Sequence, residues 1–504
     1  MAVSTAELFH EATKYTPEAL RLRLGSLEFQ DRPPPFKAYP GLERIALPKP
    51  TRDSLPGEAG GATPNLDELG RVLFLGNGVT AVARVPGEEE PELLRLRAAP
   101  SAGGMYPIEL YLAIGPGSDL DPGLYAYDSS GPALTVLQTG DPMPALARLT
   151  AVEPSLARTT AAVIVTGMFE RSAVRYDDRA YRRILLDAGH VLGNLTLALD
   201  RIGRPAMVIP GFLDDGLSRL LLLDHHVEGG LALIPLFPTG DAPPRLDPRR
   251  TRLRSGLLSE PGNTSIMRRL HRSSSLRRPL ASEPADDLSA SDRAALSPDW
   301  SEAAHALEAE APGADALVRQ IPDRRSSRSF QRREIPAETL GAILRSGLEA
   351  PGQISPGLQK TYVIVHRVEG LAPGVYRVTR SESRELALRR EPVEITPARA
   401  AVLCLGQTLT EGASALVVHC ASLTEATRRY GDRAYRYLHM DAGIIGESLN
   451  LAAPALELGA TGIGGFYDDL LSQDLGLGPD HIVLYLTALG APYGDRDEDL
   501  ESGL

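Results

Sequence analysis

Two short segments of the sequence combine residue types that could bind a phosphorylated, planar ligand. The first is RAAPSAGGMYP, Arg97–Pro107, in which small residues follow one another: Pro100, Ser101, Ala102, Gly103 and Gly104. Small residues allow a backbone to lie against a flat ring or a phosphate while its N–H groups stay free to donate. The same composition is typical of an ordinary surface turn, so this segment alone leaves both interpretations open.

The second segment is DRRSSRSF, Asp323–Phe330, which contains Arg324, Arg325, Ser326 and Arg328. It precedes the apolar-periodic run IPAETLGAILRSGL, so its cationic and hydroxyl donors are predicted near the start of a helix. That arrangement suits a phosphate monoester, because helix N-termini and arginines both attract phosphate oxygens. A solvated basic face is the alternative that this segment leaves open.

Composition limits what kind of protein can carry these segments. The length of 504 residues favours two or more domains, and the net charge of -12 argues against a general nucleic-acid or membrane-surface binder. Only two cysteines occur, and neither a signal peptide nor a membrane-spanning run is visible, so we expect a soluble cytoplasmic protein. Only 4 of the 53 basic residues are lysines, and arginine cannot act as a general base.

A long internal repeat organises the chain. YDDRAYRRILLDAG at 176–189 matches YGDRAYRYLHMDAG at 430–443, and GFLDD at 211–215 matches GFYDD at 465–469, both 254 residues apart. PGLY at 122–125 matches PGVY at 373–376, which are 251 residues apart. The repeat predicts a tandem duplication. We expect an N-terminal arm at 1–54, a first domain at 55–245, a linker at 246–311 and a second domain at 312–504.

Both copies show the same mixture of elements. Apolar, partly β-branched runs predict strands at 108–114, 161–167 and 415–421. Helical spacing of apolar residues predicts long helices at 179–200 and 433–458, and each includes an Asp-Ala-Gly sequence. Glycine inside a helix costs about 1 kcal/mol relative to alanine, and a close approach of two helices is the usual reason to keep it.

Together, these motifs resemble those of the SagB-type azoline dehydrogenases, a branch of the nitroreductase superfamily. The first copy is similar through FHEATKYTPE, RAAPSAGGMYPIELYL, PGLYAYD and RYDDRAYRRILLDAGH, and the second through DRRSSRSF, RYGDRAYRYLHMDAG and TGIGGFYDD. The resemblance implies an α+β fold acting as a dimer with FMN at the subunit interface. It also implies that one subunit supplies the arginine motif and the pair Gly464-Gly465, while its partner supplies the turn at Pro100–Gly104.

The two copies depart from that family pattern in complementary ways. At a spacing of 251 residues from the turn, the second copy reads APGQISPGL, Ala350–Leu358, so we expect it to have lost the turn. The counterpart of the arginine motif in the first copy is predicted near Arg71–Thr80, which has no Arg-Ser alternation. The first copy also reads VIPGF at 208–212 where the second reads GIGGF at 462–466. An intramolecular pseudo-dimer would therefore rebuild one complete FMN site and leave one degenerate.

Arg175-Tyr176 and Arg429-Tyr430 stand where the SagB-type family has a Lys-Tyr pair before the Asp-Ala-Gly helix. Arginine stays protonated, but it can favour a neighbouring phenolate and lower its pKa. Because the resemblance puts the pair on the subunit that supplies the turn, we expect Tyr176, beside Arg175, to be the base or proton relay. The alternative is that both tyrosines are inherited packing residues.

The resemblance implies FMN-dependent oxidation of azolines to azoles in a ribosomally made peptide, where a base takes the ring Cα proton and a hydride leaves the adjacent carbon. The expected partners are the modified peptide and a cyclodehydratase complex, with the chain acting as a monomeric pseudo-dimer or a homodimer of it. An NAD(P)H-dependent reductase of dehydroamino acids, nitro groups or quinones stays open, as does a flavin-poor scaffold. No metal is expected, because the adjacent His225-His226 is a poor ligand spacing.

Overall fold

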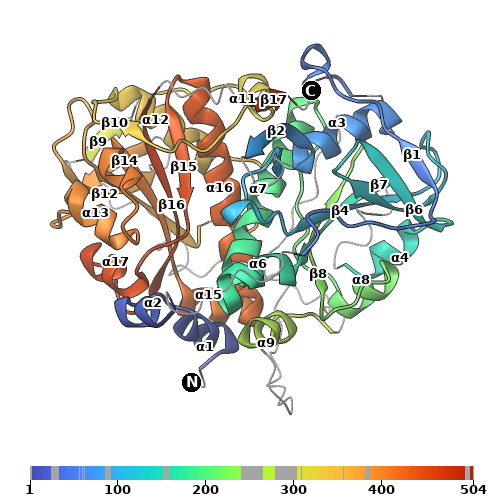
Figure 1. Cartoon of the computed structure of the whole chain (residues 1–504), viewed down its shortest axis with the longest axis horizontal. Coiled ribbons are helices and arrows are strands. Elements are labelled where there is room, and N and C mark those ends of the chain that lie inside the picture. Colours follow the sequence, from blue (N-terminus) through green and yellow to red (C-terminus); the bar gives the residue numbers. More distant parts are fainter. Residues whose placement is uncertain are drawn as a thin grey trace.

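The computed structural model describes residues 3–23, 33–55, 57–59, 61, 63–85, 92–150, 156, 159–239, 265–277, 304–307, 309–355, 357–380, 386–493 and 500–502. Two α+β halves lie side by side, the first copy on the right and the second on the left of Figure 1. This arrangement confirms the predicted intramolecular pseudo-dimer. Within the described residues, no helix is long and apolar enough to cross a membrane.

The first copy is built on a six-stranded antiparallel sheet. The strand order is β1 (Arg44–Ala46), β6 (Ala133–Thr139), β5 (Gly123–Asp128), β4 (Ile108–Ile114), β7 (Ala161–Met168) and β8 (Glu228–Pro235). Its helices are α3 (Leu66–Asn77), α4 (Met143–Arg148), α6 (Phe169–Tyr176), α7 (Ala180–Arg201) and α8 (Asp214–Leu220). The strands predicted at 108–114 and 161–167 are confirmed as β4 and β7.

The second copy repeats this plan with a larger sheet. Its order is β10 (Phe330–Gln331), β16 (His481–Pro492), β14 (Ala415–Ser422), β11 (Gln359–Val365), β12 (Gly374–Arg380), β13 (Leu386–Arg390) and β9 (Ala304–Leu307), with β15 (Gly459–Ile463) also on β16. Its helices are α11 (Ala314–Gln320), α12 (Ala337–Leu348), α13 (Pro397–Leu403), α14 (Leu409–Gly412), α15 (Leu423–Tyr430), α16 (Ala434–Ala455) and α17 (Asp468–Asp474). The strand predicted at 415–421 is confirmed as β14.

The two long helices α7 and α16 cross at the centre of the molecule, as Figure 1 shows. They cross at the glycines of the two Asp-Ala-Gly sequences. A Cβ on Gly189 would lie 2.2 Å from the Met440 carbonyl oxygen, and one on Gly443 would lie 2.3 Å from that of Leu186. Because no side chain fits between backbones this close, the predicted reason for these glycines is confirmed.

Two buried ion clusters related by a pseudo-twofold axis join the copies. In one, Arg179 and Arg182 of the first copy pair with Asp468 of the second at 2.7 and 2.6 Å. In the other, Arg433 and Arg436 of the second copy pair with Asp214 of the first, both at 2.7 Å. The first aspartate of each GF-x-DD motif therefore binds the partner copy's long helix.

The pseudo-symmetry extends into the segments predicted as arm and linker. Helix α1 (Thr5–Ala12) places the His10 ring 3.2 Å from the Tyr435 hydroxyl, and α9 (Ile266–Ser273) places His271 2.9 Å from that of Tyr181. Each copy thus has its own N-terminal helix, 261 residues from the other, and α2 (Pro17–Arg23) follows α1. Most of the predicted linker lies outside the described residues, and the predicted domain boundaries stay a prediction.

One hairpin belongs to the first copy alone. Strands β2 (Val79–Val85) and β3 (Glu92–Arg97) stand between α3 and the small-residue turn, and the C-terminal strand β17 (Leu500–Ser502) pairs with β2. In the second copy, α12 leads to the corresponding turn with no such hairpin between them. The insertion explains why the copies match at different spacings along the chain.

Candidate active site

The turn that follows β3 is bound to the centre of α7. Ser101 Oγ and the Ala102 N–H both donate to the Asp187 carboxylate, and Ser101 Oγ accepts from the Tyr106 N–H at 2.9 Å. Burial raises the pKa of Asp187 to about 7, against the hydrogen bonds from Ser101 and Ala102 that lower it. The aspartate of the Asp-Ala-Gly sequence thus positions the predicted binding turn.

The turn also lies against the predicted catalytic pair. Gly103 has a φ of +63°, and a Cβ on it would lie 2.7 Å from the Tyr176 hydroxyl and 3.1 Å from Arg175 Cδ. Only glycine combines this left-handed backbone with so little space. The structure therefore brings together Gly103, Arg175 and Tyr176, at the C-terminal end of α6.

One expectation about Tyr176 is wrong. We expected an arginine beside it to lower its pKa, but burial of the hydroxyl raises it above its ordinary value, although Arg183 and Arg175 act in the opposite direction. Tyr176 is therefore protonated near neutral pH. The neutral hydroxyl is not in the form that removes a proton, so Tyr176 needs a further change in its surroundings before it can act as a base.

Arg183 is a residue that the motif analysis missed. Its guanidinium lies 5.4 Å from the centre of the Tyr176 ring, and a Cβ on Gly464 would lie 1.6 Å from its Nη1. The side chain is 5% exposed and makes no ion pair within the described part of the chain. The repeat contained a signal, because Arg182-Arg183 of the first copy aligns with Arg436-Tyr437 of the second.

The arginine segment of the second copy lies against the first copy. It does not stand at the start of a helix, as the sequence had predicted. Residues 324–329 are an irregular loop between α11 and β10, and α12 begins only at Ala337. Arg324 Nε donates to the Ala98 carbonyl at 3.2 Å, and the Ser327 N–H donates to the Ala460 carbonyl at 3.0 Å. The segment is thereby held next to the turn on one side and to β15, which leads into Gly464, on the other.

The other members of this segment differ in exposure. Arg325 is half-buried, and its Nη1 donates to Thr80 Oγ1 on β2 at 3.5 Å. Ser326 is half-buried and Arg328 is exposed, and neither contacts the turn among the described residues. We call the assembly of Pro100–Gly104, Arg175-Tyr176, Arg183, Arg324–Arg328 and Gly464-Gly465 site A. It joins every residue group that the sequence predicted for the flavin.

Three buried polar side chains, His190, Asn194 and Glu447, lie close to site A. Both ring nitrogens of His190, both carboxylate oxygens of Glu447 and the amide of Asn194 are buried and make no hydrogen bond of good geometry to a described residue. Glu447 lies 3.8 Å from Arg324, and burial raises its pKa to about 7. Glu447 interacts with Arg324 and Asn194, and His190 interacts with the backbone of Pro100. The cations of the arginine segment and the small-residue turn fit the phosphate and the flat ring of a flavin.

A second arrangement related to site A by the pseudo-twofold axis keeps the turn's anchor. Asp441 accepts from the N–H groups of Ile354 and Ser355 at 2.6 and 2.7 Å and from Ser355 Oγ, as Asp187 does in the first copy. Gly357 has a φ of +85°, like Gly103. The turns therefore match at 254 residues instead of 251, and the prediction that the second copy has lost the whole turn is wrong.

The ligand-facing positions of this second arrangement, site B, are different. Tyr437 stands where site A has Arg183, and Pro210 stands where site A has Gly464. The Tyr430 and Tyr437 rings meet edge to face at 5.4 Å, and both are buried. Site B thus has neither the cation nor the glycine backbone of site A, and two aromatic rings fill its interior.

The predicted position of the arginine motif's counterpart in the first copy also has to be corrected. Gly76 of α3 faces Leu195, and Gly347 of α12 faces Leu449, which places α3 and α12 in equivalent positions. The segment equivalent to Asp323–Phe330 is then Arg52–Ala59, and the prediction of Arg71–Thr80 is wrong because the β2–β3 hairpin shifts the spacing. Arg71 is held within α3's own surroundings, paired with Asp67 and donating to the Glu58 carbonyl at 2.9 Å.

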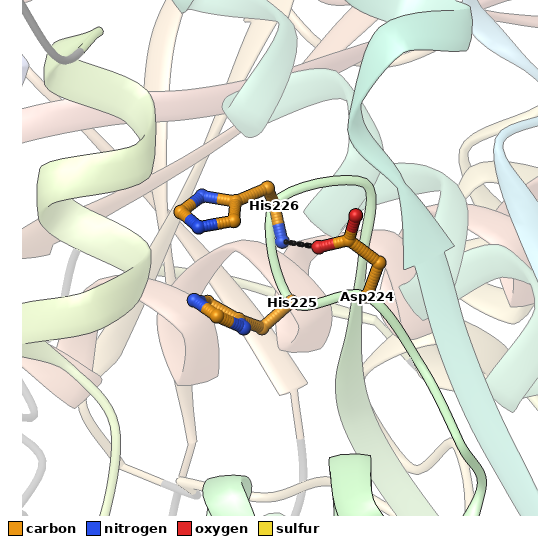
Figure 2. Close-up of side chains that lie close together, drawn as sticks. All are labelled: Asp224, His225 and His226. Atoms are coloured by element: carbon orange, nitrogen blue, oxygen red, sulfur yellow. Dashed lines mark hydrogen bonds between the residues drawn. The ribbon is translucent and has the colours of Figure 1, made fainter.

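Asp224, His225 and His226 are grouped on a surface turn (Figure 2). The His226 N–H donates to the Asp224 carboxylate at 2.9 Å, and the two imidazole rings lie 4.1 Å apart. All three side chains are exposed, and both histidines share a pocket with Arg219 and Arg268. Because arginines beside a site repel a divalent cation, we assign no metal to it.

Comparison with known proteins agrees with this fold. The model of the nitroreductase family matches residues 78–233 and 321–491, which is one match in each copy and more than half of the chain. The chain therefore belongs to the nitroreductase family, a family of FMN-dependent oxidoreductases, and is an oxidoreductase.

Its relatives include whole-chain and partial matches. A protein of Anabaena variabilis that is provisionally named a nitroreductase is 32% identical, with a TM-score of 0.82 over 98% of this chain and 100% of that one. A provisionally named nitroreductase of Methanocaldococcus jannaschii is 33% identical over 114 residues. The trifolitoxin-processing protein TfxB of Rhizobium leguminosarum bv. trifolii is 29% identical over 141 residues. The two partial matches span 23% and 27% of this chain and 56% and 38% of those relatives.

Proposed function

We propose that the chain binds one FMN, at site A, and uses it to oxidise a ribosomally made peptide. The observation that carries the proposal is the difference between the two pseudo-equivalent sites. Site A joins Gly464, Arg183 and the arginine segment to the turn, whereas Pro210 and Tyr437 replace the first two in site B. One chain then offers one set of flavin ligands, although it contains two nitroreductase-like copies.

The residues of site A divide into a phosphate end and a ring end. Arg324, Arg325, Ser326 and Arg328 supply the charge-assisted and hydroxyl donors that a phosphate monoester needs. Pro100–Gly104, Gly464 and Gly465 supply backbone without side chains or with small ones, against which a flat ring can lie. Arg183, beside Gly464, would have to move or to contact the ring edge when the flavin binds.

The stoichiometry of released flavin tests this assignment. FMN is freed from the purified chain by heat, and its absorbance is compared with the protein concentration. We expect one FMN per chain. A ratio of two would contradict the difference between sites A and B, and a chain that stays colourless after reconstitution with FMN would favour the scaffold alternative.

The reaction that we propose is oxidation of azolines to azoles. When bound, FMN supplies the hydride acceptor. The protein orients the ring of the peptide and holds or moves the proton at the Tyr176 hydroxyl, with Arg175 beside it. Similarity to a trifolitoxin-processing protein supports a peptide substrate. A cyclodehydratase partner and a cytoplasmic location belong to the same proposal.

A specific observation favours a second candidate, reduction with NAD(P)H. Tyr176 is protonated near neutral pH, and arginine stands where the SagB-type family has lysine, so neither residue of the pair is in the form that removes the ring Cα proton. Anaerobic NAD(P)H consumption by the FMN-loaded chain, with and without a nitro or quinone acceptor, separates the two. Turnover with the acceptor and none with azoline peptides would support the reductase.

A further inference from the structure

The first copy contains a pocket between α8 and α9, next to the ion cluster that Asp214 forms with the second copy. Its volume is about 360 Å³, and it is lined by Phe169, Asp214, Asp215, Ser218, Arg219, Leu223, His225, His226, Arg268, His271, Arg272, Ser275 and Arg277. Four arginines and two exposed histidines thus line one cavity of a chain whose net charge is -12. We call this cavity the α8–α9 pocket.

One of the two carboxylates that line the pocket is already paired with the second copy. Asp214 is bound by Arg433 and Arg436, so Asp215 is the one lining carboxylate outside that cluster. Arg268 pairs with Glu170, whereas Arg219 and Arg277 are exposed and make no ion pair within the described ranges. The pocket therefore has an excess of positive charge directed at solvent.

The face related to it by the pseudo-twofold axis, around α1 and α17, has the opposite character. Ser4 caps α1 as Ser265 caps α9, so Glu7 and Glu11 correspond to Arg268 and Arg272. There, Lys14 pairs with Glu11 at 2.5 Å and with Asp469 at 2.7 Å. Acidic side chains thus stand on the mirror face where the pocket has arginines, so the basic character of the α8–α9 pocket is specific to the first copy.

A strained apolar residue stands at the edge of the pocket. Leu222, directly before the lining residue Leu223, has a φ of +56° and is 75% exposed. The equivalent position of the second copy is Gly476, which adopts its φ of +67° without strain. A left-handed leucine costs about 1 kcal/mol, and exposure of its side chain returns no burial. The left-handed conformation ends α8, because the Leu223 N–H donates to the Ser218 carbonyl at 2.8 Å, and it leaves the apolar Leu222 side chain exposed beside the cavity.

We propose that the α8–α9 pocket binds an acidic segment of the peptide substrate, with Leu222 contacting an apolar residue of that segment. The inference rests on the proposed peptide function and names the chemistry that recruits the peptide. Helix α6 connects the two places, since Phe169 lines the pocket and Tyr176, seven residues on, lies in site A. At 1.5 Å per residue they are about 10 Å apart along the helix axis, a span of about three extended residues.

Fluorescence anisotropy with the full, FMN-loaded chain tests the proposal. The probe is a short fluorescein-labelled peptide of repeated Glu-Glu-Leu triplets, and its analogue has Gln in place of Glu. We expect the acidic peptide to bind about tenfold more tightly than the neutral analogue, with the difference falling as salt is raised. Equal binding of the two peptides would overturn the proposal.

Matched variants exchange residues between the two faces. Arg219→Gln with Arg277→Thr installs the residues that the mirror face has at Gln473 and Thr16, and we expect acidic-peptide binding to weaken about tenfold, since each exposed pair contributes up to about 1 kcal/mol. The control, Gln473→Arg with Thr16→Arg, should leave binding unchanged. Unchanged binding in the first pair, or equal loss in both, would sink the proposal.

Two further readouts keep this inference separate from the proposed function. Flavin content should be the same in the wild-type chain and in both double variants. If the wild-type chain bound no flavin, the proposed function would be contradicted, while the peptide-binding measurement would still test the pocket.

The sequence after Arg277 contains Glu283, Asp286, Asp287 and Asp292, which lie outside the described residues. If the peptide bound only after these were changed to Gln or Asn, the occupant would be the chain itself and the proposal would be wrong.

Discussion

Sites A and B share one scaffold and differ where a ligand would lie. Both have an aspartate on a long helix that anchors a serine-led turn, Asp187 with Ser101 and Asp441 with Ser355. Both have a tyrosine at the end of the preceding helix, Tyr176 and Tyr430. The exchanges are Arg183 for Tyr437 and Gly464 for Pro210.

The comparison separates structural residues from ligand-binding ones. The motifs that made the repeat visible, DRAYR, DAG and GF-x-DD, form the helix crossing and the two ion clusters, and they are needed whether or not a site is active. Arg183 and Gly464, which differ between the copies, belong to the candidate site, while Tyr176 and Ser101 of the same site are shared with the second copy. Identity between the copies therefore marks the common scaffold, and the exchanges at Arg183 and Gly464 distinguish site A from site B.

The largest expected effect is on the shared scaffold. Asp468→Asn leaves Arg179 and Arg182 buried without their carboxylate, and removing one partner of a buried ion pair costs about 3–5 kcal/mol. Asp214→Asn should cost a similar amount through Arg433 and Arg436. Urea denaturation at neutral pH measures both. A large loss in one variant and none in the other would show that the two clusters are not equivalent.

The second-largest expected effect is on turnover, and it should show which of the two sites is active. Tyr176→Phe removes the proton-carrying hydroxyl of site A, and we expect turnover to fall about a hundredfold or more. Tyr430→Phe changes the equivalent hydroxyl in site B and should alter turnover little. Initial rates are measured after flavin content has been confirmed in both. Full activity in Tyr176→Phe would leave the proton step without a residue.

A smaller expected effect is on the affinity for FMN, and it should show which of the two sites binds the phosphate. Arg328→Ala removes an exposed cation from the phosphate end, and because charge-assisted bonds contribute roughly 1.5–3 kcal/mol, FMN binding should weaken by about one to two decades. Arg71→Ala, in the helix of the first copy, should have no such effect. Flavin fluorescence titration of the apoprotein gives both constants. Equal losses in the two variants would mean that the phosphate lies elsewhere.

The sequence predicted the positions of the helices and strands better than the alignment of one copy with the other. Three strands and both long helices fall within one to three residues of the prediction, since their apolar spacing reflects burial on local elements. A single spacing could not describe the repeat, because the β2–β3 hairpin adds residues to the first copy alone. That insertion displaced the predicted counterpart of the arginine motif, which precedes the hairpin, whereas the counterpart of the turn was misplaced because the spacing of 251 residues applies to PGLY and not to the turn.

Two features of site A depended on three-dimensional surroundings. Arg183 has no motif of its own, and only its position between the Tyr176 ring and Gly464 marks it as part of the site. The direction of the Tyr176 pKa depends on how deeply the hydroxyl is buried, which the neighbouring Arg175 in the sequence does not indicate. Residue types predict which groups interact, while the balance of burial against charge needs the fold.

The smallest expected effect is a loss of stability at low pH through the ion cluster of Asp468. Burial alone would raise the pKa of Asp468, but Arg182 and Arg179 hold it well below its ordinary value of 3.8. A carboxyl whose folded pKa is depressed contributes stability above its unfolded pKa and loses it as pH falls below that value. The stability gap between the wild-type chain and Asp468→Asn should therefore be full near pH 7 and shrink below about pH 4, by at most about 1.4 kcal/mol per pH unit. Urea midpoints of the two proteins at pH 7, 5, 4 and 3 measure the gap, and a gap that stays constant over this range would mean that Asp468 does not titrate with the cluster.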